Sequence, residues 1–352
     1  MSNTRLSGRL MAVTLADVAR RAGVSLATAS RVLNGSARAV SDDMRARVTA
    51  AARELNYVPN AHAQALVRAT THTVGVIVHD VSDPYFAEIL RGIQRSAADA
   101  GRLMIVCNTF REPQRELEYV HLLQMQRVEA IILAGSGLDD RAYCRALTES
   151  LDSFASLGGR VAVIGRHNIA ADAVVPDNVG GARALARYLF DLGHRSFGVI
   201  DGPSLLTTSR DRRNGFVQAL TASGIDLPPE AIVSGDFTRD GGARAAITLL
   251  ERFPSITALF ALNDVMAIGA LAALRERGIA APDQVSLVGF DDIPIAADVT
   301  PALTTVRVPM SQLGAEALTL ALSNEETLRT VHLPTEIVVR QSTAPPSAAS
   351  SG

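Results

Sequence analysis

Carboxylates, amides, arginines and aromatic residues follow several short apolar runs in this 352-residue chain. Such side chains can hydrogen-bond several hydroxyl groups while an aromatic face covers an apolar ring face, which is the chemistry that carbohydrate binding requires. The predicted binding set is Asp83, Tyr85, Phe86, Arg166, Asp177, Thr208, Arg212, Phe260, Asn263 and Asp291, with Asp80, Asn178, Arg210 and Asp264 beside them. Taken singly, each also fits a solvated loop or a helix cap, the cap above all for Asp264 and Asp177.

These residues stand where strands of a parallel sheet would end. The expected strands include 74–78, 103–106, 130–133, 161–164, 197–200, 258–260 and 285–288, and the expected helices include 84–100, 180–192, 212–223 and 264–277. Strands that alternate with helices in this way are typical of a doubly wound parallel sheet, in which ligands bind beyond the carboxyl ends of the strands. Two such lobes fit the length, with the binding pocket in the cleft between them.

The segment 13–34 predicts two short helices joined by a tight turn. Thr14 can cap the first helix, with Asp17 at its third position. Gly23 suits the turn, and Ser25 can cap the second helix. This order of elements is that of a helix-turn-helix, whose second helix enters the DNA major groove.

The second helix would bury Ala29, Val32 and Leu33 and turn its opposite side outward. The outward residues are Leu26, Ala27, Ser30 and Arg31. Small side chains let a helix approach the bases closely, and the planar guanidinium of Arg31 can donate to O6 and N7 of one guanine. The alternative is an ordinary surface hairpin of helices, since short motifs also match by chance.

A third amphipathic helix is expected from Ser41 to about Leu55, with acidic residues at its positive end. The stretch 60–68 that follows is helix-forming in composition but too short to be stable alone. A segment that folds only against a partner would act as a natural switch.

Charge separates the first 68 residues from the rest of the chain. They contain ten arginines and four acidic residues, whereas the whole chain has a formal net charge of −2. The basic segment is therefore the one that carries the helix-turn-helix pattern. The chain contains no lysine, which we attribute to genome composition.

Composition excludes other classes of protein. A hydrophobic content of 47% at this length supports a small domain plus a core too large for one ordinary domain. No apolar stretch suits a signal peptide or a membrane span, so a cytoplasmic location without membrane contact is expected. Cys107 and Cys144 lack metal-ligand spacing and are expected to be reduced structural thiols. Residues 1–11, where Met11 is an alternative start, and 343–352 are expected to be disordered.

Three motifs resemble those of the LacI/GalR family of bacterial repressors: Thr14-Leu-x-Asp-Val-Ala-x-x-Ala-Gly-Val-Ser-x-x-Thr-x-Ser-Arg-Val-Leu-Asn34, Leu55-Asn-Tyr-x-Pro-Asn60 and Ala63-x-x-Leu66. The resemblance extends over roughly residues 12–342. One departure is the loop 35–40, which is one residue longer than usual. Arg38 in that loop either reaches a phosphate or is solvated.

The resemblance implies how DNA would be bound. In that family a hinge helix from each subunit inserts a leucine into the minor groove at the centre of a palindrome, which assigns this role to Leu66. Such an apolar wedge kinks the duplex by unstacking a base step. Leu26, Ala27 and Arg31 would read bases. The residues that would mainly position the DNA backbone are Thr14, Ser25, Thr28, Ser30, Asn34, Ser41, Tyr57, Asn60 and Gln64.

The resemblance also implies a core similar to periplasmic sugar-binding proteins, with chain crossings between lobes near Val175, Thr305 and Val331. No leucine-heptad tail follows this core, which favours a homodimer over a tetramer.

In relatives the positions of Arg212, Asn263 and Asp291 contact the small-molecule effector. Purine-binding members carry an arginine where this chain has Leu206. This difference makes a nucleobase a less favoured prediction for the ligand. Arg166 would suit an acidic sugar or a phosphate.

Enzyme motifs are weak or absent. Gly135-Ser-Gly137 resembles the start of a nucleotide-binding turn, but the third glycine is missing and Asp140 would repel a pyrophosphate. The sequence has no phosphate loop, no His-Glu-x-x-His and no Gly-x-Ser-x-Gly. We therefore expect no catalytic residues, no cofactor and no metal.

The expected protein is a sequence-specific transcription regulator, a repressor that binds a palindromic operator as a homodimer under control of an effector, a sugar or sugar derivative. The alternatives are a purine-type regulator that needs a corepressor and a solute-binding protein without a DNA function. The expected boundaries are 12–59 for the DNA-binding head, 60–72 for the hinge helix and linker, 73–175 with 305–330 for one lobe, and 176–304 with 331–342 for the other.

Overall fold

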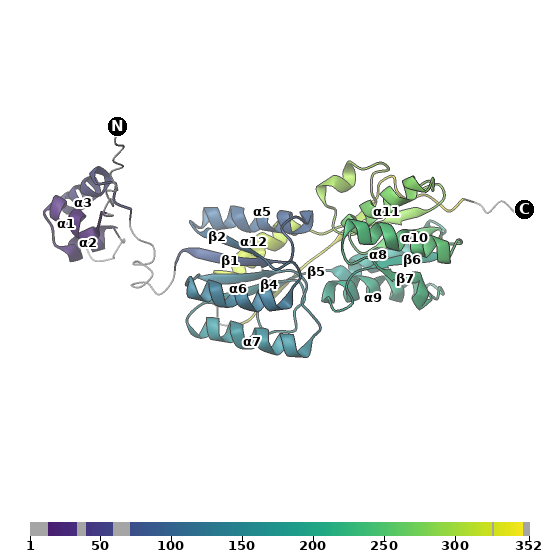
Figure 1. The fold of residues 1–352 in the computed structure, drawn as a ribbon, viewed down its shortest axis with the longest axis horizontal. Coiled ribbons are helices and arrows are strands. Elements are labelled where there is room, and N and C mark those ends of the chain that lie inside the picture. Colours follow the sequence, from purple (N-terminus) through teal and green to yellow (C-terminus); the bar gives the residue numbers. More distant parts are fainter. Residues whose placement is uncertain (1–12, 34–39, 59–70, 326, 348–352) are drawn as a thin grey trace, which may run out of the picture. The chain divides into compact units, whose positions relative to one another are not determined.

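The computed structural model describes residues 13–33, 40–58, 71–325 and 327–347. The chain divides into two compact units, Met1–Thr71 and His72–Gly352. Figure 1 labels the helices and strands of both units and colours them by sequence position, from purple at the N-terminus to yellow at the C-terminus.

Within the described residues 13–33 and 40–58, the first unit has three short helices, α1 (Leu15–Ala22), α2 (Leu26–Leu33) and α3 (Asp42–Glu54). Each contributes a fully buried residue to one small core, namely Val18, Ala29 and Val48. The three amphipathic helices expected from the sequence are thus confirmed.

The second unit has two lobes, which we call the N-lobe (72–177 and 308–333) and the C-lobe (178–307 and 334–347). The N-lobe sheet is parallel throughout, in the order β11-β5-β4-β3-β1-β2. Its strands are β1 (Thr73–Val78), β2 (Leu103–Asn108), β3 (Ala130–Ala134), β4 (Arg160–Ile164), β5 (Asp172–Pro176) and β11 (Thr330–Leu333). Its helices are α5 (Pro84–Asp99), α6 (Pro113–Met125), α7 (Arg141–Ser156) and α12 (Met310–Ala321).

Helices cover both faces of the N-lobe sheet, with α5 and α12 on one side and α6 and α7 on the other (Figure 1). Side chains that alternate along a strand therefore enter different cores: Val76 packs on the α5 side, and Ile77 packs on the α6 side. Both faces are buried, which explains the nearly continuous apolar strands in the sequence.

The helices α5 and α12 cross closely because each supplies a glycine. A Cβ added at Gly92 would lie 1.9 Å from the backbone oxygen of Ser311, and one added at Gly314 would lie 2.2 Å from that of Ile89. Since α12 comes from the far end of the chain, these two glycines fix a long-range contact that completes the N-lobe.

The C-lobe has a parallel sheet in the order β7-β6-β8-β9. Its strands are β6 (Phe197–Asp201), β7 (Ile232–Ser234), β8 (Ala258–Ala261) and β9 (Ser286–Val288). Its helices are α8 (Asn178–Asp191), α9 (Thr207–Ala222), α10 (Arg239–Arg252) and α11 (Asp264–Glu276), with short 3-10 turns η1 (Pro229–Ala231) and η2 (Pro294–Ala297). The helices pack in pairs, α8 with α9 and α10 with α11.

Two chain crossings lie later than predicted. The strand β10 (Thr305–Arg307) belongs to the C-lobe because the Asp291 N–H donates to the Val306 carbonyl oxygen at 2.8 Å, so the crossing follows Arg307 rather than Thr305. The strand β11 pairs with β5 of the N-lobe, so the last crossing follows Leu333 rather than Val331. After it, β12 (Glu336–Val338) pairs antiparallel with β10.

The predicted disordered tail from residue 343 requires correction. The Ala344 N–H donates to Ser286 Oγ at 3.1 Å, and Thr343 Oγ1 lies 2.9 Å from the Tyr188 hydroxyl. Residues 343 and 344 are therefore part of the C-lobe, because polar groups of β9 and α8 bind them. None of the described helices is long and apolar enough to cross a membrane.

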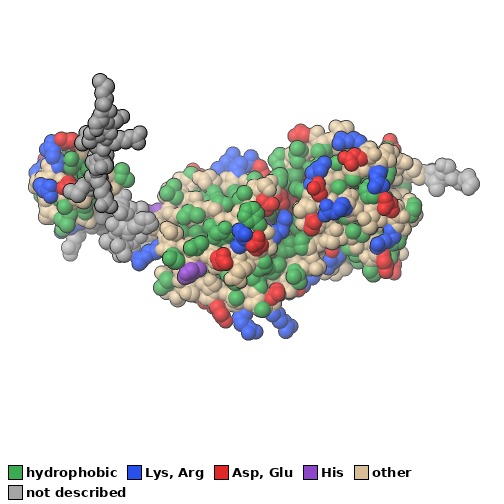
Figure 2. All heavy atoms as spheres, viewed as in Figure 1, with side chains coloured by type: hydrophobic (Ala, Val, Ile, Leu, Met, Phe, Trp, Pro, Cys, Tyr) green, Lys and Arg blue, Asp and Glu red, His purple; other side chains and the backbone are tan. Residues whose placement is uncertain are grey.

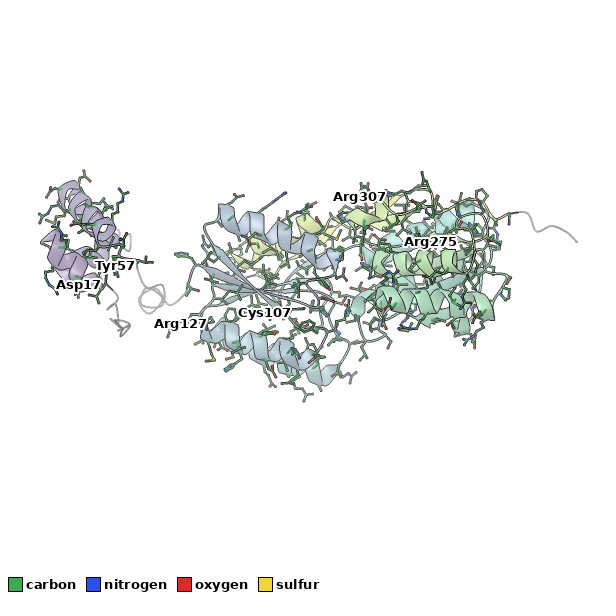
Figure 3. All side chains as sticks on the ribbon, turned by 45° about the horizontal axis from the view of Figure 1, so that its top comes forward. Asp17, Tyr57, Cys107, Arg127, Arg275 and Arg307 are labelled. Carbon is green, nitrogen blue, oxygen red and sulfur yellow. The ribbon has the colours of Figure 1, made fainter. Side chains whose placement is uncertain are left out.

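The two cysteines are free thiols. Cys107 lies on the edge strand β2 (Figure 3) and Cys144 lies in α7.

Candidate functional site

The turn between α1 and α2 is fixed by local and tertiary contacts. Thr14 and Asp17 form the predicted capping box, with the Thr14 N–H 3.0 Å from Asp17 Oδ2. Gly23 has a φ of 65°, in the left-handed region that favours glycine. Arg47 of α3 donates to the Ala22 carbonyl oxygen at 2.6 Å, so α3 holds the end of α1 in place. Figure 3 labels Asp17 on this head.

The second helix, α2, begins at the predicted cap, because the Thr28 N–H donates to Ser25 Oγ at 3.1 Å. Its Ala29 and Val32 are buried, while Leu26 is 54% exposed and Ala27 is exposed. Ser30 and Arg31, on the same outward side, are half-buried. A helix with this profile can enter a groove without unpacking its own core.

The other residues predicted to bind DNA fall into two groups. Thr14, Ser25 and Ser41 are exposed N-caps, and Thr28 is half-buried. Tyr57 is half-buried against the small core. Asn34, Asn60, Gln64 and Leu66 lie outside the described residues, as does Arg38.

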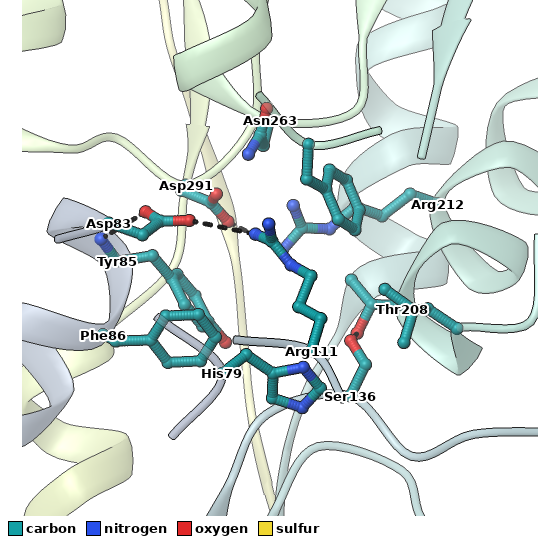
Figure 4. Close-up of a pocket in the computed structure, with 12 residues that line it drawn as sticks. His79, Asp83, Tyr85, Phe86, Arg111, Ser136, Thr208, Arg212, Asn263 and Asp291 are labelled. Carbon is teal, nitrogen blue, oxygen red and sulfur yellow. Dashed lines mark hydrogen bonds and ion pairs between the residues drawn. The ribbon is translucent and has the colours of Figure 1, made fainter. Parts of the chain in front are cut away.

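In the second unit, which we call the core domain, a pocket lies between the N-lobe and the C-lobe, at the carboxyl ends of the strands (Figure 4). Seven of the ten residues predicted for a ligand line it: Asp83, Tyr85, Phe86, Thr208, Arg212, Asn263 and Asp291. Five lining residues were not in the predicted binding set: His79, Arg111, Ser136, Leu206 and Phe237. Ser136 belongs to the Gly135-Ser-Gly137 segment, whose pattern resembles only the start of a nucleotide-binding turn.

Arg212 is the centre of the polar network in the pocket. Its Nε donates to Asn178 Oδ1 at 2.9 Å, its Nη1 to the Leu262 carbonyl oxygen at 2.7 Å, and its Nη2 to Asp291 Oδ1 at 2.7 Å. Both members of the Arg212–Asp291 ion pair are almost fully buried. The guanidinium carbon also lies 4.0 Å from the centre of the Phe290 ring. Because each of its guanidinium nitrogens donates a hydrogen bond to the protein, Arg212 holds its positive charge at a fixed position beside a ligand.

Burial controls protonation in this pocket. Burial raises the pKa of the Asp291 carboxyl to about 7, although Arg212 opposes the shift. Burial also raises the pKa of Asp83 and lowers that of His79 to about 3, so His79 is neutral at physiological pH. The pocket therefore offers neutral and charged groups side by side, a mixture suited to hydroxyl groups.

Asn263 is positioned by the helix that follows it. Its Oδ1 accepts a hydrogen bond from the Met266 N–H at 2.9 Å as the N-cap of α11. Its amide nitrogen points into the pocket (Figure 4). Asp264, for which a cap was also considered, is fully buried and instead accepts hydrogen bonds from the Ile293 N–H at 2.9 Å and Thr305 Oγ1 at 2.5 Å.

The structure places three predicted ligand residues outside the pocket lining. Arg166 is bound through two nitrogens to Asp211, at 3.0 and 2.6 Å. Asp177 caps α8 by accepting from the Gly180 N–H at 2.8 Å. Phe260 is fully buried in the C-lobe core, with its ring centre 4.6 Å from that of Phe216. In each case a nearer partner inside the protein satisfies the side chain.

Arg166 belongs to a set of contacts between lobes that we call the clasp, formed by residues 136–139 and 166 of the N-lobe and 205–211 of the C-lobe. Backbone bonds join Thr207 N to the Gly137 oxygen at 2.9 Å and Asp139 N to the Leu205 oxygen at 2.8 Å. Ser136 Oγ donates to Thr208 Oγ1 at 2.6 Å. The clasp closes one side of the pocket.

A second, larger cavity adjoins the pocket and shares His79, Arg111 and Leu206 with it. Its volume is about 560 Å³, whereas that of the pocket is about 40 Å³. We call it the outer chamber. The pocket holds only a few water molecules in this arrangement, but the outer chamber is within the size range of small-molecule sites.

The head and the core define the chain as a DNA-binding regulator with a ligand pocket, and comparison with known proteins agrees. The family described as bacterial regulatory proteins, lacI family, matches residues 14–60, and the periplasmic binding protein-like domain matches residues 186–343. The chain is 36% identical over 341 residues to the HTH-type transcriptional regulator DegA of Bacillus subtilis (strain 168), covering 95% of this chain and 99% of that protein.

Other relatives are similar over nearly the whole chain. The HTH-type transcriptional regulator GalS of Salmonella typhimurium is 40% identical, covering 88% of this chain and 89% of GalS. Among solved structures, a lac repressor dimer bound to operator and the anti-inducer ONPF has a TM-score of 0.81 at 28% identity, covering 95% of this chain and 100% of that one. A complex of the transcriptional regulator CelR with cellobiose has a TM-score of 0.68 at 31% identity, covering 94% and 99%. The chain belongs to the LacI family of transcription regulators and is not an enzyme.

Proposed function

We propose that the protein is a homodimeric repressor that binds a palindromic operator and is controlled by a sugar or sugar derivative. The observation that carries this proposal is the pairing, in one chain, of an exposed reading face on α2 with a polar pocket between the lobes of the core. Such a regulator works in the cytoplasm, where it reaches both DNA and metabolites.

Base readout is assigned to Leu26, Ala27 and Arg31. Leu26 and Ala27 are exposed on α2, and the Arg31 side chain starts from the same side. Arginine in this position can donate two hydrogen bonds to one guanine. The hinge wedge is assigned to Leu66 on the family motif alone.

A sugar-like effector is supported by the lining of the pocket. Asp83, Asn263 and Asp291 offer carboxylate and amide groups, and Tyr85 and Phe86 offer aromatic surface. Solved structures of two related regulators contain bound cellobiose and bound ribose. A purine is less well supported because Leu206, in place of the arginine of purine-binding members, lines both cavities.

A homodimer is supported by an apolar surface on the N-lobe. The strand β2 is the last in its sheet, so one of its edges is unpaired in the described chain. Its Leu103 is 74% exposed, and Met125 at the end of the neighbouring α6 is 65% exposed. Ile105, Val106 and Leu122 add to this surface, and Figure 2 shows hydrophobic side chains gathered on the side of the N-lobe that carries β2 and α6. A second copy would cover both the edge and the apolar area.

Control by the effector follows from linkage. A ligand that favours one arrangement of the lobes changes the dimer's ability to hold two heads on one operator, and DNA must then change the ligand's affinity by the same factor. A coupling of about 1–3 kcal/mol would change occupancy roughly 5-fold to 150-fold.

The test is selection of binding sites from random double-stranded DNA with the full-length protein, followed by affinity measurements on the selected site. We expect a palindrome with two half-sites, and Leu66→Ala should weaken binding strongly while effector binding stays unchanged. Leu103→Asp should yield monomers in sedimentation measurements and weaken operator binding, whereas Leu157→Asp, at an exposed site that ends α7, should do neither. Sites without symmetry, or a dimer that Leu103→Asp leaves intact, would contradict the proposal.

A further inference from the structure

The pocket is lined by two arginines that differ in what they bind. All three guanidinium nitrogens of Arg212 are engaged by protein oxygens. Arg111 forms one ion pair within the described residues, with Asp83 Oδ2 at 3.7 Å, which is beyond hydrogen-bond length. Its guanidinium carbon lies 6.0 Å from the centre of the Phe237 ring, and its side chain is 25% exposed. The N–H donors of Arg111 are therefore available to a ligand.

The backbone aims Arg111 at this position. Phe110 and Arg111, between β2 and α6, have φ values of 53° and 60°, a left-handed conformation that is uncommon for residues other than glycine. Figure 4 shows the Arg111 side chain reaching across the pocket toward Asp83. Because Arg111 lines both the pocket and the outer chamber, a molecule that fills either of them can reach its guanidinium.

The other charged groups of the outer chamber are already paired. Glu112 accepts a hydrogen bond from Arg115 Nε at 2.6 Å, and Glu116 accepts one from the Tyr143 hydroxyl at 2.6 Å. His79 is neutral because burial lowers its pKa to about 3. Among the described residues that line this chamber, Arg111 is thus the cation presented to an incoming molecule.

We propose that the effector carries an acid group, a carboxylate or a phosphate, that binds Arg111 while its hydroxyl groups bind Asp83, Asn263 and Asp291. This inference rests on the proposed function and specifies the class of effector. An arginine fork matches the two oxygens of such a group, and charge-assisted pairs are the stronger hydrogen bonds. On binding, Arg111 exchanges its long contact with Asp83 for the ligand, which frees the Asp83 carboxylate for a hydroxyl group.

The experiment compares the full-length protein with Arg111→Gln and with Arg91→Gln, a matched change on α5 at a residue that lines neither cavity. Binding is measured by calorimetry at constant ionic strength. The probes are gluconate, galacturonate, glucose 6-phosphate and ribose 5-phosphate with their neutral parents glucose, galactose and ribose. Acetate and inorganic phosphate test the acid group alone, through thermal stabilisation.

We expect the acids to bind and Arg111→Gln to weaken them by about 10-fold or more, with Arg91→Gln unchanged and Arg111→Lys in between. The carboxylate and phosphate probes then identify which acid group is recognised. Tight binding of a neutral sugar that Arg111→Gln leaves unchanged would overturn the inference and keep the proposed function. The inference would also be overturned if the binding of the sugar acids, acetate and phosphate were the same in Arg111→Gln as in the unaltered protein. The operator selection described above tests the proposed function separately.

Discussion

Arg166 of the N-lobe and Asp211 of the C-lobe are joined by two parallel hydrogen bonds, from Nε to Oδ2 at 3.0 Å and from Nη2 to Oδ1 at 2.6 Å. The pair lies within the clasp and connects the loop after β4 to the second turn of α9. Because its members belong to different lobes, it resists any motion that opens this side of the pocket.

Arg166→Gln should destabilise the core by about 1 kcal/mol, a small value because exposure to solvent screens the pair. Asp211→Asn should cost a similar amount, and the double variant should cost little more than either single one, since both remove the same interaction. Urea unfolding of the four proteins measures this coupling. The Glu88–Arg91 pair, which lies within α5, is the control and should show weaker coupling. Additive losses at Arg166 and Asp211 would show that the pair does not connect the lobes energetically.

Arg31→Ala should relax the base preference at one position of each operator half-site, at a cost of about 1–3 kcal/mol in affinity for the preferred base. The reason is that a bidentate contact to guanine would be lost while backbone contacts remain. Affinities for a set of single-base operator variants measure the effect. Arg53→Ala, at an exposed residue of α3, should leave the base preference unchanged, and the same result for Arg31→Ala would remove its assigned role.

Asp291 should make stability depend on pH. Its pKa is raised from 3.8 to about 7 in the folded protein, so the native state binds this proton more tightly than the unfolded chain. The contribution to the free energy of unfolding is complete below about pH 4 and is lost as the pH rises to about 7. Over that range the difference in stability between the protein and Asp291→Asn should fall by an amount on the order of 3 kcal/mol. Denaturant titrations at several pH values measure it, and a difference that stays constant would show that Asp291 is ionised throughout.

Gly314→Ala should destabilise the N-lobe by about 1–3 kcal/mol, a typical cost of overpacking. The added methyl group would meet the backbone oxygen of Ile89 in α5 at 2.2 Å, and a backbone atom of a packed helix cannot yield cheaply. Thermal unfolding measures the loss. Gly278→Ala is not a suitable control because its φ is 69°, so Ser323→Ala, just after α12, serves instead and should have a small effect. A stable Gly314→Ala protein would mean that α12 can move away from α5.

Features set by neighbours in the sequence were predictable. The capping box of Thr14 and Asp17 and the turn at Gly23 depend on residues a few positions apart, and the structure has both. The alternation of strands and helices predicted two parallel sheets for the same reason, because each element carries its own apolar pattern.

Features set by the other lobe were not predictable. The helix α9 begins at Thr207, five residues before the predicted start at Arg212, and its N-cap, Leu206, offers no side-chain acceptor. Instead, the Thr207 N–H at the start of the helix donates to the Gly137 carbonyl oxygen of the N-lobe. Likewise, Arg166 follows a strand as a ligand residue would, but Asp211 binds it across the clasp. Arg111 was missed because nothing in its local sequence indicates that it reaches into the pocket.

Because the chain crosses between the lobes near its C-terminal end, each lobe depends on residues that leave the ribosome last. The N-lobe needs α12 and β11, which end at Leu333. The C-lobe needs Ser342, whose carbonyl oxygen accepts from the Leu287 N–H at 2.9 Å. Domains generally fold as they emerge, from the N-terminus onward, but neither lobe here is complete until nearly the whole chain has been translated. A nascent chain halted before residue 310 would therefore expose the apolar sides of α5 and β4, and this makes the last stretch of translation the period when the protein most needs protection from aggregation.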